Sequence, residues 1–140
     1  MNLTRFESEI VDSLLWQIKG FKDGYVSERA TNRILRASLR RIKHRLIGYS
    51  EESKKETATD KDHAIPIKVI IQMLMEEPNL SKNVTIEILR QFYISVTITK
   101  YEHTVLLKKL GLASKMPNDW NGVDPLARYK KAGIQVVETK

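Results

Sequence analysis

The sequence predicts an α+β fold that is mostly helical, and three patterns predict it. Apolar residues recur at helical spacing over residues 4–19, which indicates an amphipathic helix. Residues 93–98 instead alternate, with β-branched side chains on one face, as a strand does. The stretch before that strand, residues 67–92, carries two short apolar helical patterns. We therefore expect one domain with a basic helical arm over 1–48, a linker over 49–60 and a core over 61–140.

Composition excludes several classes of protein. No run approaches the 18 apolar residues of a membrane span, and the early Glu7 does not suit a signal peptide. The chain has no cysteine, so disulfides and cysteine zinc sites are excluded. These features fit a protein that acts in the cytoplasm without a membrane partner. The net charge of +7 favours a polyanionic partner, because a protein that neutralises phosphates releases their counterions.

The N-terminal helix has a recognisable start. Thr4 followed by Glu7 is the capping-box pattern, in which each side chain bonds the other residue's backbone N–H. Gly20 is the expected end of this helix. The apolar positions Phe6, Ile10 and Leu14 share one face and predict core packing.

A second, longer helix is predicted from Ser27 to Ile47, ending at Gly48. Between Tyr25 and Gly48 there are seven Lys or Arg and a single acid, Glu28. Five of these cations fall on one face at alternating spacings of four and three residues: Arg29, Arg33, Arg36, Arg40 and Lys43. Like charges at this spacing repel one another and destabilise the helix, and a bound phosphate backbone would remove this repulsion. We interpret this face as a DNA contact; an acidic protein partner and a solvated surface are the alternatives.

Two of the three histidines lie in short segments that follow predicted strands. Asp62 and His63 are adjacent and precede the apolar residues Ile65-Pro66-Ile67. His103 falls in the first turn of a predicted helix over residues 99–110, which Thr99 and Glu102 open as a second capping box. After this helix we expect a turn-rich tail, a helical turn near residues 126–130 and an edge strand over residues 134–137.

Both segments resemble the motifs of one nuclease family. Asp62-His63-Ala64-Ile65-Pro66-Ile67 resembles the opening of HNH endonucleases, and Thr99-Lys100-Tyr101-Glu102-His103 resembles the start of their closing helix. The resemblance implies a ββα-metal-like core, here with a helical insertion between its two strands. It implies that Asp62 and His103 bind one divalent metal ion (Mg, Mn, Ni or Zn) and that His63 activates water as the general base.

The sequence departs from this family at one residue of the motif and in the length of the segment between the two strands. The motif's middle Asn has no counterpart near Phe92-Tyr93-Ile94-Ser95, and the insertion is long. The leading hypothesis is a metal-dependent DNA endonuclease. The alternatives are a non-catalytic nucleic-acid-binding or inhibitor protein on a degenerate nuclease scaffold, and a helical module that docks an acidic protein.

Each site residue also has a purely structural interpretation. Asp62 can pair with Lys61, His63 can be a surface histidine, and Glu102 serves better as a cap than as a ligand. Lys100, Arg128 and Lys130 are candidate phosphate contacts. A homodimer would suit cleavage of both strands. A shared metal ion requires the Asp62 carboxylate and the His103 ring within about 5 Å of each other.

Overall fold

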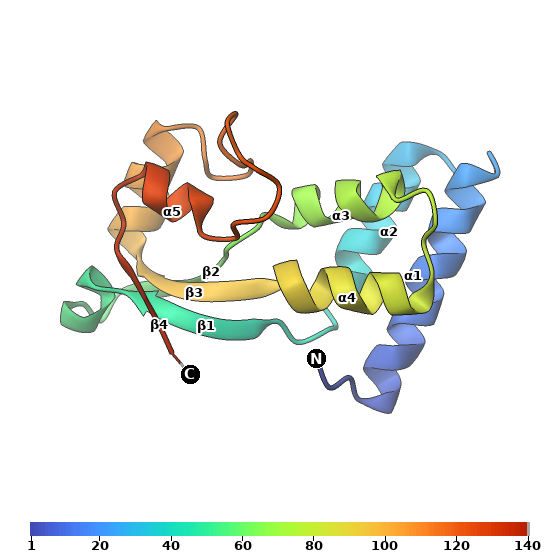
Figure 1. The fold of residues 1–140 in the computed structure, drawn as a ribbon, viewed down its shortest axis with the longest axis horizontal. Coiled ribbons are helices and arrows are strands. Elements are labelled where there is room, and N and C mark those ends of the chain that lie inside the picture. Colours follow the sequence, from blue (N-terminus) through green and yellow to red (C-terminus); the bar gives the residue numbers. More distant parts are fainter. Residues whose placement is uncertain (140) are drawn as a thin grey trace. The chain divides into compact units, whose positions relative to one another are not determined.

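The computed structural model describes residues 1–139 and has an α+β architecture in which about half of the residues are helical (Figure 1). The chain divides into two compact units, which we describe separately. Unit 1 consists of residues 1–43 and 70–91, and unit 2 of the remainder. No helix among the described residues combines the length and apolar content needed to cross a membrane.

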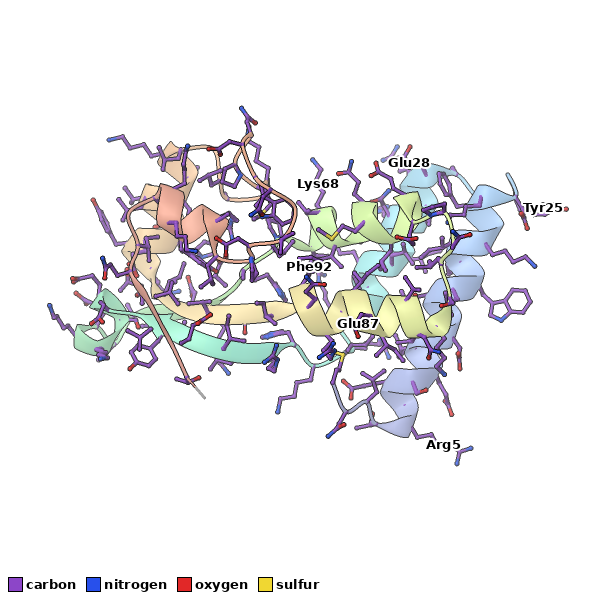
Figure 2. The ribbon with its side chains drawn as sticks, in the orientation of Figure 1. Arg5, Tyr25, Glu28, Lys68, Glu87 and Phe92 are labelled. Atoms are coloured by element: carbon purple, nitrogen blue, oxygen red, sulfur yellow. The ribbon has the colours of Figure 1, made fainter. Side chains whose placement is uncertain are left out.

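Unit 1 is helical. It contains α1 (Arg5–Lys22) and α2 (Glu28–Leu39), together with most of α3 (Ile67–Glu76) and α4 (Lys82–Phe92). The amphipathic periodicity of α1 and α2 places one apolar stripe of each helix inside. The buried side chains of these two helices are Val11, Leu14, Ile18, Thr31, Leu35 and Leu39. The side chains of Arg5 at the start of α1 and of Tyr25 in the turn between α1 and α2 extend away from the helices (Figure 2).

The predicted capping box at the start of α1 is confirmed. The Glu7 N–H donates to Thr4 Oγ1, and the Thr4 N–H donates to Glu7 Oε1, each at 3.1 Å. The second oxygen of Glu7 accepts the Lys43 N–H at 2.7 Å, so one carboxylate joins the start of α1 to the end of the segment that follows α2. The helix continues past Gly20 to Lys22, which corrects the predicted end.

The second helix is much shorter than predicted. Ser27 caps α2 as expected, but the helix ends at Leu39 and strand β1 (Arg45–Ser50) begins where the prediction continued the helix. Gly48, the predicted helix stop, lies in β1 next to a register shift. A Cβ atom there would lie 2.3 Å from the Val137 carbonyl oxygen, so the strand pairing requires glycine. Pairing with distant strands overrides the local helical pattern.

Unit 2 is built on a four-stranded mixed sheet with the strand order β2-β3-β1-β4. β3 (Ile94–Thr99) is central; β1 pairs with it in parallel and β2 (Thr59–His63) pairs with it antiparallel. β4 (Val136–Glu138) is an edge strand antiparallel to β1, two residues later than predicted at its start. Residues 49–60, predicted as a linker, instead hold the end of β1, a 3₁₀ turn (η1, Glu52–Lys55) and the start of β2.

One face of this sheet is covered by helices. A helix follows β3 directly, and it widens into a π-helical segment, η2 (Glu102–Leu107). This helix and α5 (Ala127–Lys131) lie on the same side of the sheet (Figure 1). Their buried side chains share a core with strand residues: Ala64, Ile94, Val96, Ile98, Leu107, Leu112, Tyr129 and Ile134. The order strand, two helices, strand, helix agrees with the predicted insertion between two strands.

The Glu7 carboxylate gives the first testable prediction. Hydrogen bonds from the Lys43 and Thr4 backbone N–H groups hold the pKa of Glu7 below its usual value. A group with a lowered folded-state pKa stabilises the fold above its unfolded pKa, and the effect disappears as pH falls through the folded pKa. We expect Glu7→Gln to lower the free energy of unfolding by roughly 0.5–1.5 kcal/mol at pH 7.

Urea unfolding at pH 7 and at pH 3 measures this effect, and the difference between wild type and Glu7→Gln should shrink at the lower pH. Glu9→Gln is the matched control, since Glu9 lies on the same helix and makes only an exposed ion pair with Arg5. An equal loss in both variants at pH 7 would contradict the role given to Glu7.

Candidate functional site

Two aspartates on β2 face the covered side of the sheet. In the antiparallel pairing with β3, Asp60 lies opposite Ile98 and Asp62 lies opposite Val96. Ile98 and Val96 are fully buried, so the two carboxylates share the side on which the core lies. The intervening residue Lys61 and the next residue, His63, belong to the opposite face by the same alternation.

The helix after β3 brings His103 between these two carboxylates. The Thr99 and Glu102 capping box predicted for its start is present, with hydrogen bonds of 2.9 and 3.0 Å. His103 Nδ1 lies 3.0 Å from Asp60 Oδ2, and His103 Nε2 lies 3.7 Å from Asp62 Oδ1. The 3.7 Å between His103 Nε2 and Asp62 Oδ1 is within the limit of about 5 Å for two groups that share a metal ion. His103 also lies in the π-helical segment, a distortion found frequently at functional sites.

The other oxygen of Asp62 is held by two residues of the α5 region. Asp62 Oδ2 accepts the Tyr129 hydroxyl at 2.6 Å and an Arg128 N–H at 2.9 Å. Arg128 is fully buried and also donates to the carbonyl oxygens of His63 and Leu112, each at 2.7 Å. It therefore has no surface to offer a phosphate, which corrects its prediction as a nucleic-acid contact. We call Asp60, Asp62, His103, Arg128 and Tyr129 the site cluster.

The hydrogen bonds of His103 leave one position for a cation. If Nδ1–H donates to Asp60, then Nε2 carries a lone pair that faces the acceptor Asp62 Oδ1. Two facing acceptors repel unless a proton or a metal ion lies between them. The hydrogen bonds from His103 and Lys100 hold the pKa of Asp60 below its usual value, so Asp60 is ionised and accepts from the imidazole.

The residues present fit a metal ion with two protein ligands. Two atoms bound to one ion at about 2.1 Å lie about 3.0–3.4 Å apart, so the 3.7 Å separation closes with a small movement. Asp60 behind His103 is the carboxylate that commonly orients a metal-binding histidine. Among residues 1–139 no group of three or more His, Cys, Asp or Glu side chains is placed to hold an ion. Such an ion would therefore take most of its ligands from water or substrate.

His63 lies away from the other predicted site residues and packs among aromatic rings. Its ring stacks on Tyr93 with centroids 5.4 Å apart, and His44 meets it edge-on at 4.8 Å. Burial and the nearby His44 lower the pKa of His63, so this imidazole is neutral at pH 7. Its Nδ1 atom is buried and has no hydrogen-bond partner in the described part of the chain. A neutral histidine is the form that can accept a proton.

Sequence reasoning missed three residues of this region. Asp60 could have been found, because residues two apart on a strand share a face and Asp62 was already a candidate. His44, predicted in a helix, precedes β1 and places Nδ1 2.8 Å from Ser95 Oγ. Tyr129 and the buried role of Arg128 carried no local signal, since they join Asp62 from more than sixty residues away.

The predicted basic face is exposed but shorter than expected. Arg29, Arg33, Arg36 and Arg40 are all exposed and follow one side of α2 and its C-cap, opposite the buried Leu35. We call these four residues the arginine stripe. Lys43 is exposed beyond the end of the helix. Lys100 is also exposed, and its ammonium group lies 2.8 Å from Asp60.

Comparison with protein-family models, with curated proteins and with solved structures gives no match. The resemblance to HNH endonucleases therefore depends on the two motifs and on the geometry of the residues in them.

The buried Arg128–Asp62 pair gives the second prediction. Removing one partner of a buried ion pair leaves the other charge without compensation and costs about 3–5 kcal/mol. We expect Arg128→Met to lower the free energy of unfolding by about this amount, and Tyr129→Phe by about 1–2 kcal/mol. Urea unfolding at pH 7 measures both changes.

The double variant Arg128→Met/Asp62→Asn should be less destabilised than the sum of its single variants, because neither charge then remains alone. Lys131→Met is the control, because Lys131 lies in the same helix as Arg128 but makes only an exposed ion pair with Asp119. It should change the free energy of unfolding by at most about 0.5 kcal/mol. A loss for Arg128→Met as small as this control would contradict the role of the pair.

Proposed function

We propose that this protein is a metal-dependent endonuclease that hydrolyses phosphodiester bonds in DNA. The observation that carries the proposal is the placement of Asp62 Oδ1 opposite His103 Nε2, with Asp60 on the other nitrogen of the same ring. A carboxylate and an imidazole that share a cation are what the HNH-like motifs imply for these two residues.

The order of elements around the site supports the same proposal. β2 and β3 are antiparallel neighbours, and the helix after β3 carries His103 back over β2. This is the arrangement of parts in a ββα-metal core, with α3 and α4 as the insertion between the strands.

Each residue of the site cluster has a defined task in this proposal. Asp62 and His103 hold the divalent ion, and Asp60 fixes the ring of His103 in one tautomer. Arg128 and Tyr129 occupy one oxygen of Asp62 and so keep the other directed at His103. When bound, the ion supplies a Lewis acid for the charge that develops on the phosphate and the leaving oxygen.

His63 is the proposed general base. It is the neighbour of Asp62 in sequence but faces the other side of β2, so the substrate has to pass the end of this strand to reach both residues. β2 is an edge strand of the sheet, and no neighbouring strand blocks this path. The lowered pKa of His63 keeps it able to accept a proton from water at neutral pH.

The arginine stripe is the proposed contact to the phosphate backbone. Its four guanidinium groups are exposed, and no ion pair within residues 1–139 involves them. Like charges at this spacing on a helix repel one another, and a row of phosphates would remove that repulsion.

A second candidate is a nucleic-acid-binding protein without catalysis. The observation that favours it is the Arg128 guanidinium 2.9 Å from Asp62, which already neutralises the proposed metal ligand. In that case the site cluster is a structural hydrogen-bond network, and no metal binds. The two candidates share the arginine stripe and differ in whether the site cluster takes up an ion.

The third prediction separates these two candidates. We expect the wild type to nick supercoiled plasmid with Mg²⁺, Mn²⁺ or Ni²⁺ but not with EDTA. His103→Ala, Asp62→Asn and His63→Ala should each lose at least about a hundredfold in rate, because each removes a ligand or the base. Titration calorimetry with Mn²⁺ should show binding by the wild type and by His63→Ala but not by His103→Ala.

Asp60→Asn should weaken Mn²⁺ binding by about ten- to a hundredfold, since it changes only the group behind the ligand. Asp119→Asn is the control acid, because its side chain is exposed and bonded only to Lys131. A wild type that binds no Mn²⁺ and cuts no plasmid, yet binds DNA, would leave the second candidate.

The fourth prediction concerns the arginine stripe. Replacing all four arginines by glutamine should weaken binding to a DNA duplex and make the dependence of log K on log salt shallower by up to about 0.9 per lost phosphate contact. Fluorescence anisotropy at several salt concentrations measures both. A variant with Lys55, Lys68, Lys108 and Lys109 replaced by glutamine has the same net charge change and tests whether position matters.

If the two variants lose the same affinity, the stripe contributes only net charge. Unchanged binding by the stripe variant would leave α2 as a surface for a different partner, such as an acidic protein.

A further inference from the structure

The sheet of unit 2 has a second face, on the side away from the apolar core, and its end near Ser95 and His63 is closed by His44 and Tyr93. Alternation along the strands and the register of their pairing assign the side chains of this face. Tyr49 lies opposite Thr97 on one side and Val137 on the other, and Lys61 lies opposite Thr97 from β2. We call this the open face; its strand residues are Leu46, Tyr49, Thr59, Lys61, His63, Ser95, Thr97, Thr99 and Val137, of which Ser95 and Thr99 are buried.

The two faces of the sheet differ in charge. Among the described residues the strands contain three acids, and all three belong to the covered side by register: Asp60, Asp62 and Glu138. The open face has no acidic strand residue in residues 1–139 and carries the exposed Lys61. Lys54 of η1 adds a second ammonium group, which lies over the ring of Tyr49 and 4.0 Å from Glu51 Oε2. Lys61 is thus the lysine of the open face that makes no ion pair within residues 1–139, and Thr97 lies between it and Tyr49 by register.

Tyr49 presents the face of its ring on this surface. The Lys54 ammonium lies 5.0 Å from the ring centroid, a position that a hydrated charge takes only where the ring borders solvent. Leu46 on the same strand is 45% exposed, and Lys61 is exposed on β2. An aromatic ring between ammonium and hydroxyl groups on an open sheet combines a stacking platform with phosphate contacts.

We propose that the open face binds a single-stranded nucleic acid, with one base stacked on Tyr49 in place of the Lys54 ammonium group and the backbone held by Lys61 and the displaced Lys54. Stacking requires a base whose face is free, and a duplex hides its base faces between neighbouring pairs. The charge of this face selects a polyanion over an apolar protein surface or a second copy of this chain. This inference rests on the proposed function, because cleavage of the bound strand requires the proposed nuclease.

The open face also gives the bound strand a direction. Lys61 and His63 are the β2 residues of this face, and β2 is the edge strand whose other side carries Asp60 and Asp62. A strand that runs from Tyr49 across Lys61 meets His63 at this edge. The proposed nuclease would therefore act on single-stranded DNA or on an unpaired segment at the end of its binding surface.

Fluorescence anisotropy in EDTA tests the open face without cleavage. The probes are a labelled oligothymidylate of 12 nucleotides and a labelled 12-base-pair duplex. We expect the wild type to bind the single strand more tightly than the duplex. Tyr49→Leu, which keeps an apolar side chain, should weaken single-strand binding by roughly five- to a hundredfold. Lys61→Gln should make the salt dependence of single-strand binding shallower by about 0.7.

Tyr49→Phe keeps the ring and should bind the single strand as the wild type does, which separates stacking from a general loss of structure. Tyr25→Leu is the matched control, because Tyr25 is 86% exposed in unit 1 (Figure 2) and should have no effect. Circular dichroism and thermal unfolding verify that each variant is folded.

Single-strand affinity that Tyr49→Leu leaves unchanged would overturn the proposal, and so would equal weakening by Tyr49→Leu and Tyr25→Leu. A wild-type dimer in light scattering that Tyr49→Leu separates, with no effect on oligonucleotide binding, would assign the open face to a second copy and also overturn it. Failure of the proposed nuclease is recognised separately, because loss of plasmid nicking or of Mn²⁺ binding leaves these affinities unchanged.

Discussion

The structure of unit 2 depends on one buried charge. The guanidinium group of Arg128 has no exposed surface, so every donor needs a partner inside the protein. It finds them on two segments distant in sequence: the Asp62 carboxylate with the carbonyls of residues 63 and 64, and the carbonyls of residues 112 and 113. A charge with this many fixed partners locks these segments in one arrangement, and apolar packing alone would restrict them less.

The same group also determines how the site residues are presented. β2 ends at His63, where its carbonyl and that of Ala64 turn to Arg128 instead of continuing the strand ladder. Asp62, the last inward-facing residue of that strand, is thereby held through one oxygen and left open at the other. The orientation of Asp62 toward His103 follows from a contact made sixty-six residues later in the chain.

Local signals in the sequence were sufficient for the helix starts and for the strand over residues 94–99. The side chains of Thr4, Ser27 and Thr99 each accept from the backbone N–H three positions on, so the motif contains its own partner. The end of α2 was not predictable in this way, because residues 45–50 continue a helical pattern and become a strand only through pairing with β3 and β4. At the site, the closeness of Asp62 and His103 followed from the motifs. Arg128 could not be distinguished from the neighbouring surface lysines before the fold was known.

The position of β2 at the edge of the sheet has a consequence for self-association. An edge strand offers unpaired backbone groups to any other extended chain, and proteins commonly block such pairing with charged side chains. Three of the five residues of β2 are charged: Asp60, Lys61 and Asp62. Two of them belong to the site cluster, so residues of the candidate site also oppose pairing at this edge. Loss of these charges would leave an uncharged edge strand open to addition of a strand from another molecule. The same three residues would therefore oppose strand addition whether or not the site holds a metal ion.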